Sequence, residues 1–172
     1  HLLLTIDEST VILAAPGYNY GVYSFDNKVT RINEGAFSGI NSLTQIDLSN
    51  VNLIEAYAFK DCINLKSVIL GSEIDVKEYA FADCTSLTNV SLRYPTALKD
   101  WSIFENCVNL EHVSTDCIRG NIPCKTFDGC VKLRNFCAAG IETIEELIGK
   151  GDLNESQIKY IAFGSDNIGY VL

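Results

Sequence analysis

The chain has 172 residues, 47% of them hydrophobic, and a formal net charge of −9 at pH 7. That length supports one well-buried core or one continuous array of repeats. The acidic balance argues against a nucleic-acid binder, which would show a basic patch or stripe, and no stretch approaches the ~18 apolar residues that span a bilayer. The chain contains no methionine. We therefore expect a processed mature protein or a fragment, without its targeting segment.

Residues 1–28 lie ahead of a repeating region. They contain two short apolar alternations, Leu2–Ile6 and Val11–Ala15, followed by a turn at Pro16-Gly17. The open end of a repeat array needs an atypical capping segment, and two short strands joined by the Pro-Gly turn would supply one. We predict that residues 1–28 form an N-terminal cap.

Residues 29–138 contain five copies of one phrase. A phenylalanine recurs every 22 or 23 residues, at Phe37, Phe59, Phe81, Phe104 and Phe127. Three positions later comes a cysteine, except in the first copy, which has Ile40; a leucine follows at the sixth position and an Ile, Val or Phe at the ninth. Self-similarity at this period indicates a solenoid, in which neighbouring copies bury a shared core.

Each copy contains a predicted strand and a predicted turn. The spacing Leu65-x-x-Val68-x-Leu70 alternates with period two after its first leucine and predicts a strand with one buried face. The segment 58–62 lacks alternation and favours a short helical turn on the opposite side. A further buried contact lies five residues before the phenylalanine, as at Ile54. We predict an α/β repeat solenoid, a right-handed coil with one stacked parallel β-sheet.

Four cysteines share one position of the repeat: Cys62, Cys84, Cys107 and Cys130. Their side chains would point the same way into the core, where a free cysteine behaves as a small hydrophobic residue. We expect a ladder of free thiols. Cys117 and Cys124 invite a disulfide or metal interpretation, but their spacing matches no common zinc pattern. We favour free thiols there too; the redox state of these two and of Cys137 stays open.

Residues 139–172 keep a weaker form of the repeat. Apolar residues at helical spacing over 141–148 predict a helix. Ile158, Ile161 and Phe163 then follow 25 residues after Leu133, Phe136 and Ala138. We predict a degenerate sixth repeat and a C-terminal cap, so that residues 1–172 form a single solenoid domain.

The phrase A-F-x-x-C-x-x-L-x-x-I-x-L resembles the BspA-like leucine-rich repeats of bacterial and protist surface proteins. The resemblance covers residues 29–138 strongly and 139–163 weakly. The first copy departs from the phrase at Ile40, and the fourth and fifth lack the Ala-Phe pair. The resemblance implies a leucine-rich-repeat solenoid with a secreted or cell-surface binding and adhesion role. It implies no reaction, no cofactor and no fixed set of binding residues.

The outward side chains of the predicted strands form a shallow, mostly polar face. If Val68 and Leu70 are buried, Ser67 and Ile69 face outward, and the same holds in every copy. Solenoids bind partners on such extended faces, although the face is equally compatible with a plain solvated surface. The candidate partner-binding residues are Gln45, Asp47, Ser67, Ile69, Asn89, Ser91, His112, Ser114, Asn135 and Tyr160.

We expect no enzymatic, metal or cofactor site. His112 is the only internal histidine, and cysteine–histidine catalysis would need an activated thiolate beside it. We expect an exposed surface histidine instead.

The leading functional hypothesis is a secreted or cell-surface module that recognises a host or matrix protein through the sheet face. One alternative is carbohydrate binding through Tyr57, Tyr79 and Trp101. Another is an intracellular protein-interaction scaffold, which abundant free thiols favour. Neither nucleic-acid binding nor membrane insertion is expected.

Overall fold

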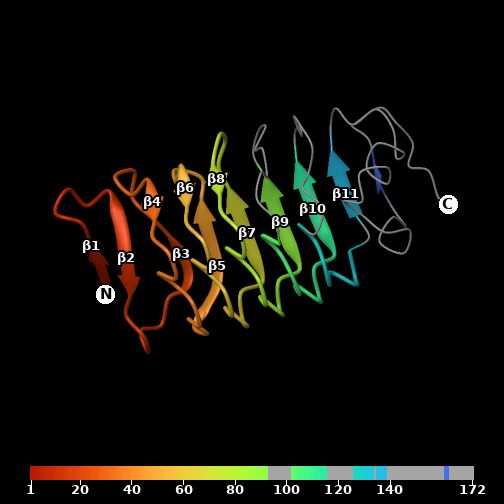
Figure 1. The fold of residues 1–172 in the computed structure, drawn as a ribbon, viewed down its shortest axis with the longest axis horizontal. Coiled ribbons are helices and arrows are strands. Elements are labelled where there is room, and N and C mark those ends of the chain that lie inside the picture. Colours follow the sequence, from red (N-terminus) through yellow and green to blue (C-terminus); the bar gives the residue numbers. More distant parts are fainter. Residues whose placement is uncertain (93–101, 116–125, 134, 139–160, 163–172) are drawn as a thin grey trace.

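The computed structural model describes residues 1–92, 102–115, 126–133, 135–138 and 161–162. Over these residues the chain winds as a solenoid, with its strands stacked side by side along the long axis (Figure 1). One continuous cluster of buried residues runs from Val11 to Leu133 and takes side chains from two sheets. The predicted repeat solenoid is therefore confirmed.

The larger sheet has seven strands, and every neighbouring pair is parallel. The strands are β3 (Gly21–Ser24), β5 (Leu43–Leu48), β7 (Ser67–Leu70), β9 (Asn89–Leu92), β10 (His112–Thr115), β11 (Asn135–Ala138) and β12 (Ile161–Ala162). β12 pairs Ile161 with Phe136, as the 25-residue spacing predicted. This sheet is the stacked parallel sheet that the alternating segments indicated.

A second, five-stranded sheet was not predicted. It consists of β1 (Leu2–Leu4), β2 (Thr10–Ala14), β4 (Arg31–Ile32), β6 (Leu53–Ile54) and β8 (Asp75–Val76). The return legs of successive coils lie close enough for their peptide groups to bond, as where the Glu55 N–H donates to the Ile32 carbonyl at 3.0 Å. In the first three repeats the additional buried contact, Ile32, Ile54 or Val76, is the inward residue of the two-residue strands β4, β6 and β8.

The N-terminal residues contribute two strands, β1 and β2, to the small sheet and one strand, β3, to the large sheet. β1 and β2 form an antiparallel hairpin closed by residues 5–9, where the Asp7 carboxylate accepts hydrogen bonds from the Thr5 hydroxyl and the Ser9 N–H. The Pro16-Gly17 turn instead lies between β2 and β3, which belong to different sheets. The prediction that the Pro16-Gly17 turn joins the two strands is therefore wrong, because the polar turn at residues 5–9 closes the hairpin.

The expected helical turns around each phenylalanine are not confirmed, since the described residues contain tight turns and no helix. Residues two positions before and after the phenylalanine have left-handed backbone angles, as at Tyr57 (φ 59°) and Asp61 (φ 59°). A left-handed residue interrupts a right-handed helix. The helix expected over 141–148 lies outside the described residues.

These turns form their hydrogen bonds across coils. The Phe59 N–H donates to the Ala80 carbonyl of the next coil at 2.8 Å, and the Asp61 N–H donates to the Ala82 carbonyl at 3.0 Å. The intervening Lys60 N–H bonds within its own turn, to the Tyr57 carbonyl. Alternate peptide groups therefore link one coil to the next along the solenoid.

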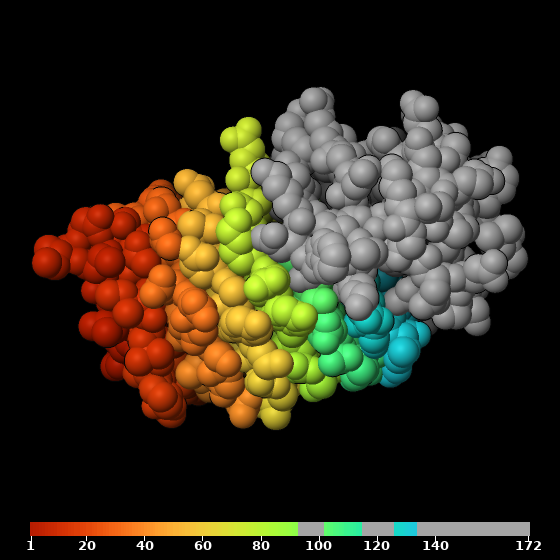
Figure 2. Space-filling model, in the orientation of Figure 1, coloured from red at the N-terminus to blue at the C-terminus, as the bar shows by residue number. Residues whose placement is uncertain are grey.

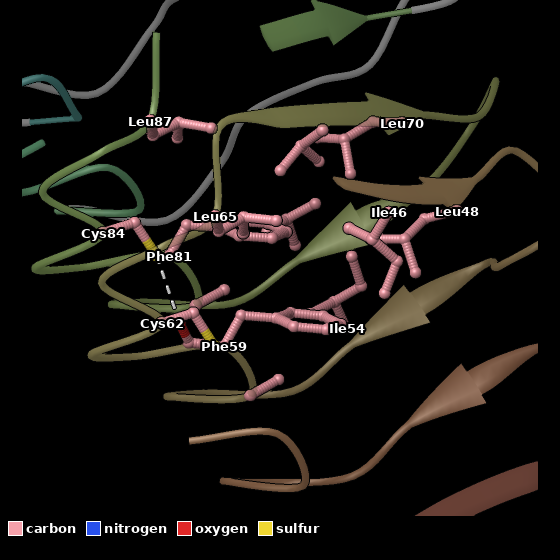
Figure 3. Packing of buried hydrophobic residues seen from close by; sticks show 14 of the residues in the cluster. Ile46, Leu48, Ile54, Phe59, Cys62, Leu65, Leu70, Phe81, Cys84 and Leu87 are labelled. Carbon is pink, nitrogen blue, oxygen red and sulfur yellow. Dashed lines mark hydrogen bonds between the residues drawn. The ribbon is translucent and has the colours of Figure 1, made fainter. Parts of the chain in front are cut away.

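The five repeat phenylalanines form a stacked column in the core. Figure 3 shows two of its members, Phe59 and Phe81. Successive rings are nearly parallel, with centroids 5.0 Å apart between Phe37 and Phe59 and 5.6 Å apart between Phe104 and Phe127. Each of the five side chains is at most 1% exposed. The column confirms the structural interpretation of the repeated phenylalanine.

The four repeat cysteines are free and buried, as expected. Each thiol donates a hydrogen bond to the phenylalanine carbonyl of the preceding coil, as from Cys84 Sγ to Phe59 O at 3.2 Å (Figure 3). A thiol is a weak donor small enough for this space. Burial holds the pKa of the Cys62 thiol far above its ordinary value, and the neighbouring Cys84 adds to the effect.

Substitution of Phe81 by alanine removes the central ring of the column. We expect a loss of about 3–5 kcal/mol in the free energy of unfolding, because a large cavity replaces a fully buried ring. Urea denaturation measures the change. Tyr57→Ala, which truncates an exposed aromatic residue, should cost clearly less; equal losses would contradict the packing argument.

The Cys62 thiol should make stability pH-dependent on the alkaline side. The unfolded thiol ionises near pH 8.5, about its ordinary pKa, whereas the folded thiol stays protonated. Its contribution is therefore complete below about pH 8.5 and falls by about 1.4 kcal/mol per pH unit above it. Denaturation in urea at several alkaline pH values should give a shallower slope for Cys62→Ala than for the unsubstituted protein. Identical slopes would show that burial does not suppress ionisation.

Candidate binding face of the large sheet

The register of the large sheet aligns the first predicted column of outward residues. Gln45 pairs with Ser67, Ser67 with Asn89, and Asn89 with His112. His112 in turn pairs with Asn135, whose backbone alone is described. The inward neighbours Val68 and Val90 are at most 1% exposed, which fixes the column on the outer face.

The second column lies two residues further along each strand. Asp47 pairs with Ile69, Ile69 with Ser91, and Ser91 with Ser114. The sheet thus brings eight predicted side chains together on one face: Gln45, Asp47, Ser67, Ile69, Asn89, Ser91, His112 and Ser114. Tyr160 lies outside the described residues.

β3 extends both columns by one strand that the sequence interpretation missed. Val22 pairs with Gln45, and Ser24 pairs with Asp47. Val22 is 73% exposed, so the first column begins with an apolar side chain. The alternation of Gly21-Val22-Tyr23-Ser24 was the available signal, but these residues precede the first repeat phenylalanine and were assigned to the cap.

The face is nearly neutral, and its polar groups make local contacts. Asp47 carries the one carboxylate in the two columns as described, and its Oδ1 accepts a hydrogen bond from the Ser49 N–H at 2.9 Å. Asn89 Nδ2 donates to Thr88 Oγ1 at 2.7 Å. His112 Nε2 lies 3.7 Å from a Glu111 carboxylate oxygen. The arrangement offers hydrogen-bond donors and acceptors to a flat surface laid over it.

Neither a metal cluster nor a membrane-spanning helix appears in the described part of the chain. No three or more ligating side chains are gathered there in an arrangement that would hold a metal ion, and no helix there has the length and apolar character needed to cross a membrane.

The two tyrosines of the carbohydrate alternative lie in the turns next to the phenylalanine column. The rings of Tyr57 and Tyr79 stack with centroids 5.4 Å apart and planes 3° apart. Each ring therefore covers one face of the other, although Tyr57 is 37% exposed. Trp101, the third member of the expected aromatic strip, lies outside the described residues.

The strands end at a close approach between coils. Gly71 follows β7, and a Cβ there would lie 2.3 Å from the Ser49 carbonyl oxygen of the preceding coil. Only glycine fits this backbone contact without movement. The close approach holds the ends of β5 and β7 side by side.

The stacked coils define a leucine-rich-repeat solenoid, a class of repeat proteins that act as interaction modules. The model of the BspA type leucine rich repeat region matches the chain with six copies, over residues 19–134 and 76–169. The chain therefore belongs to the BspA-type leucine-rich-repeat family, as its repeated phrase indicated. No curated protein matches the chain in sequence.

Three solved structures share the fold. The leucine-rich-repeat protein TpLRR of T. pallidum has a TM-score of 0.56 at 20% identity, over 85% of this chain and 76% of that one. The pneumococcal vaccine antigen PcpA has a TM-score of 0.61 at 12% identity, over 87% and 44%. A leucine-rich-repeat protein of Bacteroides ovatus has a TM-score of 0.52 at 19% identity, over 80% and 45%. The chain thus spans less than half the length of the last two.

Substitution of Gly71 by alanine should destabilise the protein by about 1–3 kcal/mol, because the added methyl group meets backbone rather than a movable side chain. Thermal or urea denaturation measures the loss. Ser72→Ala, at the adjacent exposed position, should change stability by less than about 0.5 kcal/mol. If Gly71→Ala were as stable as Ser72→Ala, the coils that carry Ser49 and Gly71 would move apart at little cost in free energy.

Proposed function

We propose that this protein is a non-enzymatic, secreted or cell-surface adhesion module that recognises a host or matrix protein through the outer face of the large sheet. The observation that carries the proposal is the pair of aligned outward columns, from Val22 and Ser24 to His112 and Ser114. The side chains are short, and the face is continuous across at least five strands.

The electrostatics of the face favour a protein partner. The chain contains 22 acidic and 13 basic residues, yet the two columns carry one carboxylate among the described side chains, at Asp47. Charged residues are depleted at the centre of protein–protein interfaces, since each must lose its water. A sheet surface that avoids charge in a strongly acidic protein shares this depletion of charge with such a centre.

The aromatic pair supports carbohydrate binding less well. A sugar stacks on an open ring face, and Tyr57 and Tyr79 each use one face on the other. The large sheet, by contrast, presents backbone-fixed rows of amides and hydroxyls, which suit hydrogen bonding to a polypeptide surface.

The surface location rests on resemblance. The repeated phrase is similar to those of bacterial and protist surface proteins, and one structural relative is a pneumococcal vaccine antigen. Labelling of intact source cells with an antibody against the chain tests this location. A signal only in permeabilised cells would favour the intracellular scaffold.

A panel of immobilised matrix and host proteins, run beside a glycan array, identifies the class of partner. We expect hits among the proteins alone. Hits confined to glycans would replace the protein-binding proposal with the carbohydrate alternative.

Once a partner is found, Asn89→Arg tests the face. Asn89 is exposed at the middle of the first column, and a long charged side chain there should weaken binding by about tenfold or more, equivalent to about 1.4 kcal/mol. The matched control is Asn52→Arg, an exposed asparagine that precedes β6 of the small sheet. Equal affinities of the two variants would place the binding surface elsewhere.

A further inference from the structure

The turns before the phenylalanine column carry a row of left-handed residues. Successive coils lie side by side along the solenoid (Figure 2), and the Tyr57 N–H donates to the Glu78 carbonyl of the next coil, beside Tyr79. In the first four repeats, the residue two positions before the phenylalanine has a positive φ. We call these four residues the turn column: Gly35 (62°), Tyr57 (59°), Tyr79 (57°) and Ser102 (58°).

Two members of the turn column are residues that this backbone conformation does not favour. Glycine adopts left-handed angles freely, whereas a large side chain adopts them at a cost in free energy. Gly35 shows that the fold accepts glycine at this position of the repeat. Because strained backbone conformations cluster at functional sites, the tyrosines at 57 and 79 point to a use for their rings.

The aromatic pair has room beside it on the side of the preceding coil. The rings of Tyr57 and Tyr79 cover each other, with planes 3° apart, so an incoming group must contact an outer ring face. The turn column continues from Tyr57 to Gly35, where a Cβ would meet no atom within 4 Å. Tyr57 is also 37% exposed. The space over Gly35 therefore admits a planar group beside the Tyr57 ring.

The charges around this space favour a cation. Glu34 directly precedes Gly35, and Glu78 directly precedes Tyr79. Both glutamates are exposed, and neither forms an ion pair with another described residue. The basic side chain of the same turn is already paired, since Lys60 Nζ lies 2.7 Å from a carboxylate of the next coil. The net charge of −9 adds a wider negative field.

We propose that the Tyr57–Tyr79 pair binds an arginine side chain of a protein partner. The planar guanidinium stacks on the outer face of Tyr57, over Gly35, and the Glu34 carboxylate accepts hydrogen bonds from its N–H groups. Arginine fits better than lysine, because a guanidinium is flat and more weakly hydrated than an ammonium group. The turn column lies outside the outward columns of the large sheet, so this contact is independent of the proposed binding face.

Titration with a short, capped peptide of alternating arginine and glycine tests the site. Binding to the whole chain is followed by calorimetry or NMR at low ionic strength, where charges are weakly screened. A peptide with citrulline in place of arginine is the reference, because citrulline has nearly the same shape and no charge. The arginine peptide should bind, and the citrulline peptide should bind at least about fivefold more weakly.

Substitutions of Tyr57 separate the aromatic contact from general charge attraction. Tyr57→Leu removes the ring and should weaken binding of the arginine peptide about two- to fivefold, the range of an exposed cation–π contact. Tyr57→Phe keeps the ring and should retain the affinity. The matched control is Tyr18→Leu, which removes an equally exposed ring, also 37%, outside the turn column. It should bind like the unsubstituted protein, and all three variants should keep its circular dichroism spectrum.

Substitution of Glu34 tests the charge. Glu34→Gln should weaken binding of the arginine peptide and reduce its dependence on salt. Glu73→Gln, which removes the same charge at another exposed residue, should weaken it less.

Absence of binding overturns the proposal, as do equal affinities for the arginine and citrulline peptides. An unchanged affinity in Tyr57→Leu, or an equal loss in Tyr18→Leu, does so too. Neutral oligosaccharides that bind only when Tyr57 is intact, while the arginine peptide does not, would assign the pair to carbohydrate instead.

Discussion

The spacing of the solenoid depends on the backbone of one residue in each coil. The peptide groups of four repeat phenylalanines, Phe37, Phe59, Phe81 and Phe104, bind the following coil. For example, the Phe59 N–H donates to the Ala80 carbonyl, and the Phe59 carbonyl accepts the Cys84 thiol. These bonds set successive coils about one strand spacing apart. Ring stacking, strand pairing and the alignment of the outward columns all follow from that distance. A left-handed residue on either side of the phenylalanine turns the neighbouring N–H groups along the solenoid axis, and this is why the turn is not a helix.

Side-chain periodicity predicted the features that depend on side chains. The phenylalanine column, the free thiols and the register of β5, β7 and β9 follow from counting apolar positions. The small sheet and the non-helical turns depend on backbone hydrogen bonds, which the apolar pattern does not record. One signal was nevertheless present. The residue two positions after each phenylalanine is always of a type that tolerates left-handed angles: Gly39, Asp61, Asp83, Asn106 and Gly129.

The first coil was not recognised in the sequence because it has Ala14 at the position of the repeat phenylalanine. The Ala14 N–H donates to the Ala36 carbonyl at 2.8 Å, the bond that Phe37 makes to Ala58 in the next coil. The rings of Tyr20 and Phe25 instead end the stack, edge-on to Phe37 with centroids 5.6 Å and 5.9 Å away. The candidate face could be located from strand alternation alone. Its ligand could not, because a row of amides and hydroxyls is chemically compatible with many surfaces.

The outward columns have a consequence that the repeat conceals. Inside the solenoid, a shift by one coil exchanges one phenylalanine for another and changes almost nothing. Outside, the same shift exchanges Gln45 for Ser67, Ser67 for Asn89, and Asn89 for His112. A surface laid along the first column therefore meets a different functional group at each of these steps, so alignments that differ by one coil are not equivalent. The buried side chains are thus nearly the same in every coil, whereas the outward side chains distinguish one coil from the next.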